Sequence, residues 1–486
     1  MTLIVAVGCG SNASLHLSDG AAADGPAVVA DGSAPIANDS GVAFLDGSSS
    51  VADHPAADGP SLMGDTSTVD APGVDGVTVG ADAGADQAAP ATDVSYISDG
   101  PEGPPDAPLA FDSSPEVSEV GGTSAARFCE LGADVAGATV PGGFCLRRYA
   151  TVKVARTIVF APNGDLFVGA PSTGTAGGAS GGPGAIVVLS DDNHDGVSET
   201  STFLDGVSDV HGLALGDGYL YWTTQSSVWR TPFTPGQRRE LDGKREDLKL
   251  PVGFGYGGRW THGLAHSVGG ALYASKGQYG SCGLNGGGEI SRVNMGQLTT
   301  VASGFRNPMY MRCHFRDDAC AATELGEDGQ SGAREKLVGI RTTAADYGYP
   351  CCFSKDAPYP AAQPGACAGV RQEDASFPLS DTPFGFDWER DLWPETYRGA
   401  VFVALHGSFY TNPAWAGARL VFARVDPTTH MPIEGWRDFI GGFGPGGSAL
   451  ERPSDVAFSP DGRLFFADDQ GGGVYWVAPV GLAQSK

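Results

Sequence analysis

The sequence predicts an all-β fold, a six-bladed β-propeller preceded by a disordered acidic tether. Two observations predict it. One hairpin phrase returns at intervals of about 50 residues after position 150, and the first quarter of the 486-residue chain carries acidic residues with no basic ones. All eight tryptophans follow residue 128, so a large core is expected only there.

The N-terminal quarter has the composition of a disordered linker. Residues 1–125 contain 19 Asp and Glu and no Lys or Arg, and repeats of Asp-Gly, Ala-Asp and Ser-Asp surround single apolar residues. Such a segment buries too little apolar surface to offset the entropy of ordering the chain. We therefore expect a tether over residues 10–125 and a propeller over 126–486. The net charge of −27 and the absence of a basic face exclude nucleic acid as a partner.

The first ten residues, MTLIVAVGCG, form a short apolar run. A bilayer span needs about 20 apolar residues, so this run is too short to cross a membrane. Residues 1–9 resemble the end of a bacterial lipoprotein signal peptide, although the usual preceding basic stretch is missing. The resemblance implies that Cys9 is acylated. The protein would then sit outside the cytoplasm of a bacterium, in the periplasm, at the outer membrane or at the cell surface, and touch membrane only through its lipid. The alternative is an ordinary apolar N-terminus.

Cysteine usage fits an oxidising compartment. Eight cysteines remain besides Cys9, an even number that allows four disulfides. Cys129 with Cys145 and Cys313 with Cys320 would each close a short loop, and we expect these pairs among the many connectivities that are open. No two-residue Cys spacing with a His partner occurs, which argues against zinc held by cysteines.

The recurring phrase combines apolar alternation, a Gly-containing turn and a Leu with an aromatic, which is typical of a β-hairpin. It occurs at IVFAPNGDLFVGA (158–170), HGLALGDGYLYWTT (211–224), HGLAHSVGGALYASKG (262–277) and PSDVAFSPDGRLFFADD (453–469), with weaker forms at 307–326 and 397–408. Hairpins at blade intervals indicate a propeller. A β-sandwich would also contain many hairpins, but it gives no reason for one phrase to return at this interval.

Two arginines immediately precede such hairpins, Arg306 in SGFRNPMYM and Arg452 in LERPSDVAF. The inner strands of a propeller end at an axial channel where loops from different blades converge, and ligands bind there. We therefore expect both arginines at the axis.

From about Val140 to Val477 the chain resembles the glucose/sorbosone dehydrogenase family. The resemblance rests on the hairpin phrases together with ASGFRNP, DYGYP and YRGAVFVALHGS, in the same order. It implies a six-bladed propeller that uses PQQ and calcium to oxidise an aldose, a sorbosone-like sugar or a polyol. We expect a monomer that acts on a small-molecule sugar.

The resemblance also implies which residues hold the cofactor. PQQ is an ortho-quinone with three carboxylates, so its pocket needs fixed cations, and arginine supplies charge with a planar fork. Arg306 matches the arginine beside the quinone, and Arg452 lies near a cofactor-binding arginine. His406 takes the place of a lysine in the glucose enzymes. The alternative for each arginine is a structural pairing with carboxylates or carbonyls of the blades.

The catalytic base departs from the family pattern. Sugar oxidation needs a base for the hydroxyl proton, and the family's histidine position is occupied here by Arg259. Arginine stays protonated and cannot act as a base, which leaves Arg259 a cofactor contact at most. His262 and His211 are the candidate bases. Each is alternatively a packed, hydrogen-bonded histidine.

Two calcium sites are expected. The resemblance implies that Gly326 and Glu327, in TELGEDG, bind calcium through backbone carbonyls, although the family's proline is absent. The DDNHDGVSE loop resembles an EF-hand loop in which Asp191, Asn193, Asp195 and Glu199 supply oxygens, but Thr202 occupies the last ligand position. The alternative for this loop is a solvated acidic turn.

Two functions from different classes follow. The first is an extracytoplasmic PQQ-dependent sugar oxidoreductase, favoured by the Arg-Asn-Pro motif at Arg306. The second is a catalytically degenerate propeller that binds a glycan or a protein as a surface lipoprotein, favoured by the arginine at position 259.

Overall fold

A computed structural model describes residues 127–484, apart from 173–183, 208, 251–260, 284–285, 328–329, 331, 342–343, 409–415 and 446–447. Cys9, the tether and Arg259 therefore lie outside the described residues. Among those described, no helix is long and apolar enough to cross a bilayer.

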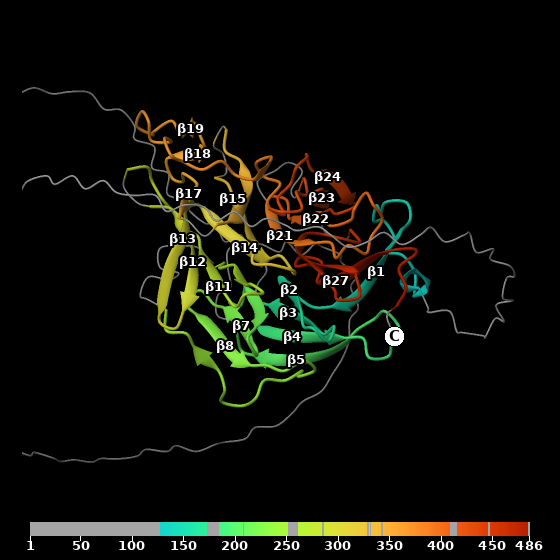
Figure 1. Cartoon of the computed structure of the whole chain (residues 1–486). Helices are drawn as coiled ribbons and strands as arrows, with labels where there is room; N and C mark the ends of the chain where they lie inside the picture. Colours follow the sequence, from blue (N-terminus) through green and yellow to red (C-terminus); the bar gives the residue numbers. More distant parts are fainter. Residues whose placement is uncertain are drawn as a thin grey trace, which may run out of the picture. The chain divides into compact units, whose positions relative to one another are not determined.

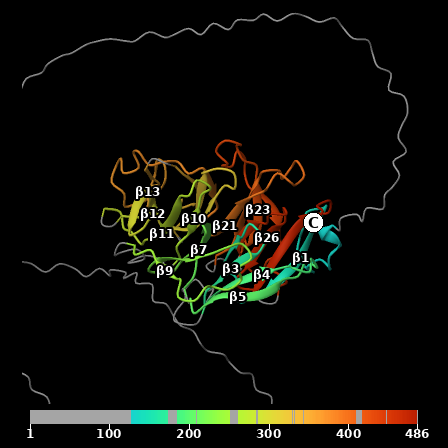
Figure 2. The same cartoon turned by 60° about the horizontal axis from the view of Figure 1, so that its bottom comes forward.

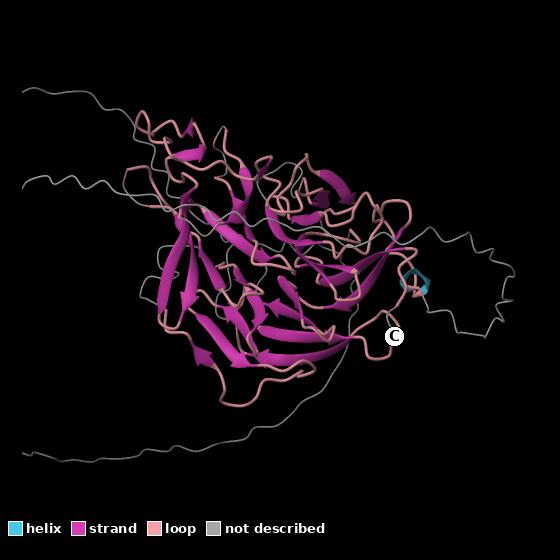
Figure 3. Ribbon diagram, viewed as in Figure 1, coloured by secondary structure: helices cyan, strands magenta, loops and turns pink. Residues whose placement is uncertain are grey.

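Six sheets, antiparallel except for one edge strand, surround a common axis, which confirms the predicted six-bladed propeller (Figures 1 and 2). In the first five sheets the innermost strand comes first in the chain and the other strands follow outward in chain order, whereas the outermost strand of the sixth sheet comes from the N-terminal side. Figure 3 shows the dominance of strands; the described part contains one short helix, η1 (Phe128–Glu130).

The strands of the six blades have the following bounds. Blade 1 contains β2 (Thr157–Phe160), β3 (Leu166–Ala170), β4 (Ala185–Ser190) and β5 (Glu199–Asp205). Blade 2 contains β6 (Leu213–Gly216), β7 (Tyr219–Thr223), β8 (Val228–Pro232) and β9 (Glu246–Asp247). Blade 3 contains β10 (Leu264–His266), β11 (Leu272–Lys276), β12 (Gly288–Asn294), β13 (Gln297–Phe305) and β17 (Ala345–Asp346). Blade 4 contains β14 (Asn307–Cys313), β15 (Cys320–Leu325), β16 (Glu335–Ile340) and β20 (Ala375–Phe377). Blade 5 contains β21 (Pro383–Trp388), β22 (Val401–Leu405), β23 (Arg419–Ala423) and β24 (Arg437–Ile440). Blade 6 contains β25 (Pro453–Phe458), β26 (Leu464–Asp468), β27 (Gly473–Pro479) and β1 (Phe144–Thr151).

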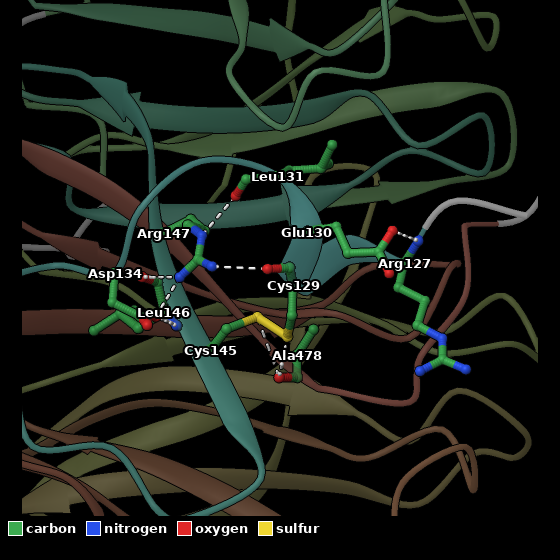
Figure 4. Close-up of a disulfide and its surroundings, with 9 residues drawn as sticks. All are labelled: Arg127, Cys129, Glu130, Leu131, Asp134, Cys145, Leu146, Arg147 and Ala478. Atoms are coloured by element: carbon green, nitrogen blue, oxygen red, sulfur yellow. Dashed lines mark hydrogen bonds and ion pairs between the residues drawn. A yellow bond between two sulfur atoms is a disulfide. The ribbon is translucent and has the colours of Figure 1, made fainter.

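Blade 6 closes the ring with strands from both ends of the propeller sequence. β1 pairs antiparallel with β27, from Phe144 opposite Pro479 to Thr151 opposite Gly473. The segment before β1 is fastened to it by the Cys129–Cys145 disulfide and by Arg147, which donates to the carbonyls of Leu131 (2.6 Å) and Cys129 (2.9 Å) (Figure 4). Closure therefore depends on a covalent and polar clasp as well as on strand pairing.

The remaining disulfides fasten the connections of blades 3 and 4. Cys313–Cys320 joins the ends of β14 and β15, and both predicted pairs are thus confirmed. Cys282–Cys351 and Cys352–Cys367 hold the insertion between β16 and β20, which contains a small two-stranded sheet of β18 (Cys352–Ser354) and β19 (Ala357–Pro358).

One predicted hairpin is wrong. The phrase at 397–408 holds a single strand, β22, and its hairpin partner β21 lies upstream across a connection of residues 389–400. The carboxylate of Glu389 organises this connection, since it accepts backbone N–H groups of Asp391 (2.9 Å), Leu392 (2.6 Å), Trp393 (2.8 Å) and Gly399 (2.7 Å). A buried side chain thus takes the place of a short Gly turn.

Neighbouring blades are joined near the axis by hydroxyl groups on their second strands. Thr223 donates to the carbonyl of His262 (2.8 Å), and Thr323 donates to the carbonyl of Phe384 (2.8 Å). Ser275 makes the equivalent bond to the carbonyl of Pro308. The blades approach so closely that a Cβ on Gly212 would lie 2.6 Å from the carbonyl oxygen of His262.

We expect Thr323→Val to lower the free energy of unfolding by about 1–2 kcal/mol, because it leaves the buried carbonyl of Phe384 without its donor. Urea unfolding measures the change. Thr299→Val, at an exposed position of β13, is the control and should leave stability nearly unchanged. Equal midpoints for the two variants would contradict a role of the hydroxyl in joining the blades.

Candidate functional site

The starts of the six innermost strands lie at one end of the axis. Each blade adds an even number of antiparallel strands before the next begins, so these strands all run in the same direction. The residues that follow the second strands lie at the same end. Long stretches of sequence separate the strands that are joined at this end, between β3 and β4, β9 and β10, β11 and β12, and β22 and β23. Loops of this kind carry binding residues in scaffold folds, so this end is the candidate site.

A buried charge network occupies this end of the axis. Asp469, which follows β26, forms an ion pair with Arg156, just before β2, and a hydrogen bond with His406 Nε2, just after β22 (2.9 Å). Arg452, just before β25, donates from Nε to the carbonyl of His406 (3.1 Å) and from Nη2 to that of Gly407 (2.5 Å). All four of these polar residues are buried. Three blades therefore meet in one hydrogen-bonded cluster.

The cluster holds one ionised carboxylate and two guanidiniums at neutral pH. Burial alone would raise the pKa of Asp469, but its interactions with His406 and Arg156 lower it to about 2. Burial lowers the pKa of His406 to about 3, so its imidazole is neutral. Burial also lowers the pKa of Arg452, to about 10, and its guanidinium remains protonated at pH 7. The carboxylate of the neighbouring Asp468 does not join this cluster and accepts hydrogen bonds from the backbone N–H groups of Glu451, Arg452 and Gly471.

Aromatic side chains from three blades form a floor beneath the cluster. The hydroxyl of Tyr310, on β14, donates across the axis to the carbonyl of Arg156 (3.0 Å). Its ring contacts His211 edge-on, with centroids 5.0 Å apart, and Phe384 at 5.2 Å. Phe384 stacks on His406 at 4.0 Å. These contacts cross the axis, so the charged groups face one end of it.

A second polar group lies beyond this floor. Arg312, two residues after Tyr310, donates to both carboxylate oxygens of Asp455 (3.2 Å each) and to the carbonyl of Ile158 (3.2 Å). It lines an axial cavity of about 130 Å³ together with His266 and Asp387. The two ends of the axis thus carry separate groups of charged side chains, with the aromatic floor between them.

Arg306 lies at the candidate end, as the sequence predicts, between β13 and β14. Its backbone N–H donates to Glu324 Oε1 (2.7 Å), and its carbonyl accepts from the N–H of Gln278 (2.9 Å). Glu324 also pairs with Lys336 at 3.0 Å, and both of those side chains are buried. Arg306 is partly buried, and its contact with PQQ stays a prediction.

The two candidate bases have different surroundings. His262 is fully buried, with Nδ1 2.9 Å from the carbonyl oxygen of Ser275 and Nε2 3.0 Å from that of Gln225. Burial lowers its pKa to about 4. His211 lies in the aromatic floor against Tyr310, with Nδ1 3.2 Å from the carbonyl oxygen of His262, and burial holds its pKa well below the usual value.

The predicted calcium residues fall at opposite ends. Gly326 and Glu327 follow β15 at the candidate end. A Cβ on Gly326 would lie 2.5 Å from the carbonyl oxygen of Arg334, so only glycine fits there. Glu327 interacts with Tyr359, whose pKa is raised by burial and by this carboxylate.

The DDNHDGVSE loop joins β4 to β5 at the other end. Its oxygens accept N–H groups of the loop itself: Asp191 from Gly196 (3.1 Å), Asn193 from Asp195 (3.0 Å) and Glu199 from Asp192 (3.1 Å). Within the described residues, the carboxylates of Asp191, Asp195 and Glu199 do not converge as a group of three. Calcium binding by this loop stays a prediction.

Sequence reasoning missed Arg156, Asp469, Tyr310 and Phe384. A signal for Arg156 was present, because it precedes its hairpin as Arg306 and Arg452 precede theirs. Asp469 follows its second strand as His406 follows β22. The two aromatic residues lie inside innermost strands, where nothing in the sequence separates them from ordinary core residues.

Comparison with known proteins shows the fold. No known family profile and no curated protein sequence matches the chain. Among solved structures, a Trichoderma reesei carbohydrate-active enzyme of family AA12 is similar, with 16% identity, a TM-score of 0.56, and coverage of 70% of this chain and 97% of that one. The PQQ domain of a pyranose dehydrogenase from Coprinopsis cinerea is similar at 17% identity and a TM-score of 0.55, with coverage of 70% and 96%. The propeller described here thus has the fold of these two proteins.

We expect Asp469→Asn to lower the free energy of unfolding by about 3 kcal/mol at pH 7, because it leaves the buried guanidinium of Arg156 without its carboxylate. The folded-state pKa of about 2 lies below the usual value, so this stabilisation is complete above about pH 4 and is lost as the pH falls toward 2. Urea unfolding at pH 7, 4 and 2.5 measures it.

Asp438→Asn is the matched control, since the exposed Asp438 pairs with Arg419 at 2.8 Å on the surface. It should change stability little at any of the three pH values. Equal losses for the two variants, or a difference that does not shrink in acid, would contradict the buried pairing.

Proposed function

We propose that the protein is an extracytoplasmic quinoprotein oxidoreductase that uses PQQ and calcium to oxidise a sugar or a polyol at the axis of the propeller. One observation carries the proposal: buried guanidinium groups from separate blades gather at one end of the axis. The fold shared with the PQQ domain of a pyranose dehydrogenase supports it.

The residues present fit an anionic, oxygen-rich cofactor. PQQ carries three carboxylates, and a buried anion needs fixed cations or directed donors. Arg306 and Arg452 would hold it, with Arg156 as a further cation in the same cluster. His406 Nδ1 is buried and has no hydrogen-bond partner among the described residues, so it can contact a bound group. Arg259 would add a contact from its connection.

When bound, PQQ supplies a two-electron acceptor for the hydride of the substrate. The chain supplies the remaining functions. The arginines orient the cofactor, and the floor of Tyr310 and Phe384 closes the axis beneath it, which limits access of water from the other end. A histidine accepts the hydroxyl proton of the substrate.

His211 is the better candidate for this base. It lies in the floor of the candidate site beside Tyr310, and burial keeps its imidazole neutral at pH 7. His262 directs both ring nitrogens at backbone carbonyls, so acting as a base would require it to give up one of these contacts.

Calcium at Gly326 and Glu327 would be bound through backbone carbonyls, which is chemistry that calcium favours. The connection after β15 lies at the same end of the axis as the arginines. A cation there would offset the charge of the cofactor.

Four disulfides support a location in an oxidising compartment. Anchoring through acylated Cys9 would place the propeller on a long acidic tether outside the cytoplasm, where a small-molecule sugar is accessible.

A second candidate function is a degenerate propeller that binds a glycan or a protein. It is favoured by the contacts of His262 with two carbonyls together with the arginine at the family's base position.

Reconstitution of the purified full chain with PQQ and Ca²⁺ distinguishes the oxidoreductase from the degenerate binding propeller. We expect PQQ, added with Ca²⁺ at micromolar concentrations, to remain bound after gel filtration with its quinone absorbance. We expect the loaded protein to reduce a redox dye with at least one sugar of an aldose and polyol panel. Arg306→Leu should weaken PQQ binding at least tenfold by equilibrium dialysis, because it removes a cation and its donors.

Arg316→Leu is the matched control, since Arg316 is exposed at the other end and pairs with Asp391 at 2.6 Å. It should bind PQQ as the wild type does. Failure of the wild-type protein to retain PQQ would refute the quinoprotein proposal and leave the binding role.

The choice of base has its own test. In the loaded enzyme His211→Gln should lower kcat by about 10²–10⁴-fold while PQQ binding is retained, because only proton transfer is removed. His262→Gln is the comparison, and we expect a smaller effect on kcat. The reverse order of effects would assign the base to His262.

A further inference from the structure

We propose that His314, Asp317 and His430 form a binding site for a divalent transition-metal ion, with Zn²⁺ as the best fit, at the end of the propeller opposite the candidate active site. One potential ligand atom from each of the three residues lies within 4.8 Å of the others. The site is independent of PQQ and of the calcium positions discussed above.

The three side chains come from two blades and face one another. His314 and Asp317 lie in the connection between β14 and β15, and His430 lies in the connection between β23 and β24. Asp317 Oδ2 is 2.8 Å from His430 Nε2, and Asp317 Oδ1 is 3.5 Å from His314 Nδ1. The two imidazole rings stack with centroids 3.6 Å apart and an interplanar angle of 11°. His314 Nδ1 and His430 Nε2 thus both face the carboxylate of Asp317.

His314 provides a second, independent observation. Its side chain is only 7% exposed, and Nδ1 is buried without a hydrogen-bond partner among the described residues. A buried polar atom that lacks a partner costs free energy, and native structures contain few of them. The nitrogen faces Asp317 and the neighbouring imidazole, so a metal ion bound there would satisfy it.

The first half of the site is held rigidly. The Cys313–Cys320 disulfide closes the connection that carries His314 and Asp317. Within it the N–H of His314 donates to the carbonyl of Ala319 (2.7 Å), and the N–H of Ala319 donates to Asp317 Oδ1 (3.0 Å). These bonds leave Asp317 Oδ2 directed at His430.

The second half is held as firmly. His430 has φ 56°, a left-handed conformation that is uncommon for residues other than glycine. Its N–H donates to the carbonyl of Asp426 (2.8 Å), and its carbonyl accepts from Trp388 Nε1 (2.9 Å). Backbone strain that surrounding bonds maintain is a feature of functional sites.

The ligand chemistry selects the metal. Two imidazoles and one carboxylate suit Zn²⁺ and its neighbours, whereas Ca²⁺ and Mg²⁺ prefer sets of oxygen ligands. Three protein ligands leave a fourth position for water. The guanidinium of Arg390, which interacts electrostatically with His314, is already paired with Asp387 at 2.8 Å, which limits its repulsion of a metal ion. Bound metal would join blade 4 to blade 5.

Metal titration of the full chain, dialysed against a chelator and free of PQQ, tests the proposal. We expect Zn²⁺ to bind at about one equivalent with micromolar or tighter affinity by calorimetry, and to raise the unfolding temperature. Co²⁺ in its place should give the visible absorption bands of a tetrahedral site. Asp317→Asn, which keeps the shape of the side chain, and His430→Ala should each weaken Zn²⁺ binding at least tenfold.

His266→Gln is the control, because His266 lies at the same end and pairs with a single carboxylate, Asp217, at 3.1 Å. It should bind Zn²⁺ as the wild type does. Absence of Zn²⁺ binding to the wild type, or equal affinity in Asp317→Asn, would overturn the proposal and leave a His-Asp-His contact that only joins the blades. Because the readout needs neither PQQ nor sugar, it is unaffected by failure of the oxidoreductase proposal.

Discussion

The buried carboxylate of Asp469 is the interaction on which the candidate site depends. It pairs with Arg156 from blade 1 and His406 from blade 5 while its own residue belongs to blade 6. A buried guanidinium without such a partner would cost several kcal/mol, so the cluster exists only if the three blades meet at the axis. They meet because β1 completes blade 6 from the N-terminal side and closes the ring. The charge cluster of the site therefore forms only when the ring is closed.

This constraint divides the axis into two chemically different ends. Tyr310 and Phe384 form a floor, with the arginine cluster on one side of it and Arg312 with Asp455 on the other. The arginine end suits an anionic cofactor, and the opposite end carries the imidazoles of His314 and His430. A six-bladed ring can hold both because each blade contributes loops to both ends.

The sequence predicts the ring well because its signals are local. A Gly-containing turn between apolar strands determines a hairpin within about 15 residues, and its return at a fixed interval determines a propeller. The hairpin of blade 5 escaped this reasoning because Glu389, and not a turn residue, organises its connection. Arg452 could be placed at the axis from its position before a hairpin, whereas the axial position of the Arg306 side chain stays a prediction. The partnership of Arg156 with Asp469 could not be predicted, because 313 residues separate them and only the closed ring brings them together.

A double-mutant cycle on Arg156 and Asp469 tests the central claim most directly. Free energies of unfolding would be measured in urea for the wild type, Arg156→Met, Asp469→Asn and the double variant. If the closed ring brings these two residues into one buried ion pair, each single variant is strongly destabilised, and the double variant recovers about 2 kcal/mol or more relative to the sum of the single losses. Additive losses would mean that the two side chains do not interact, and the buried cluster at the axis would have no basis.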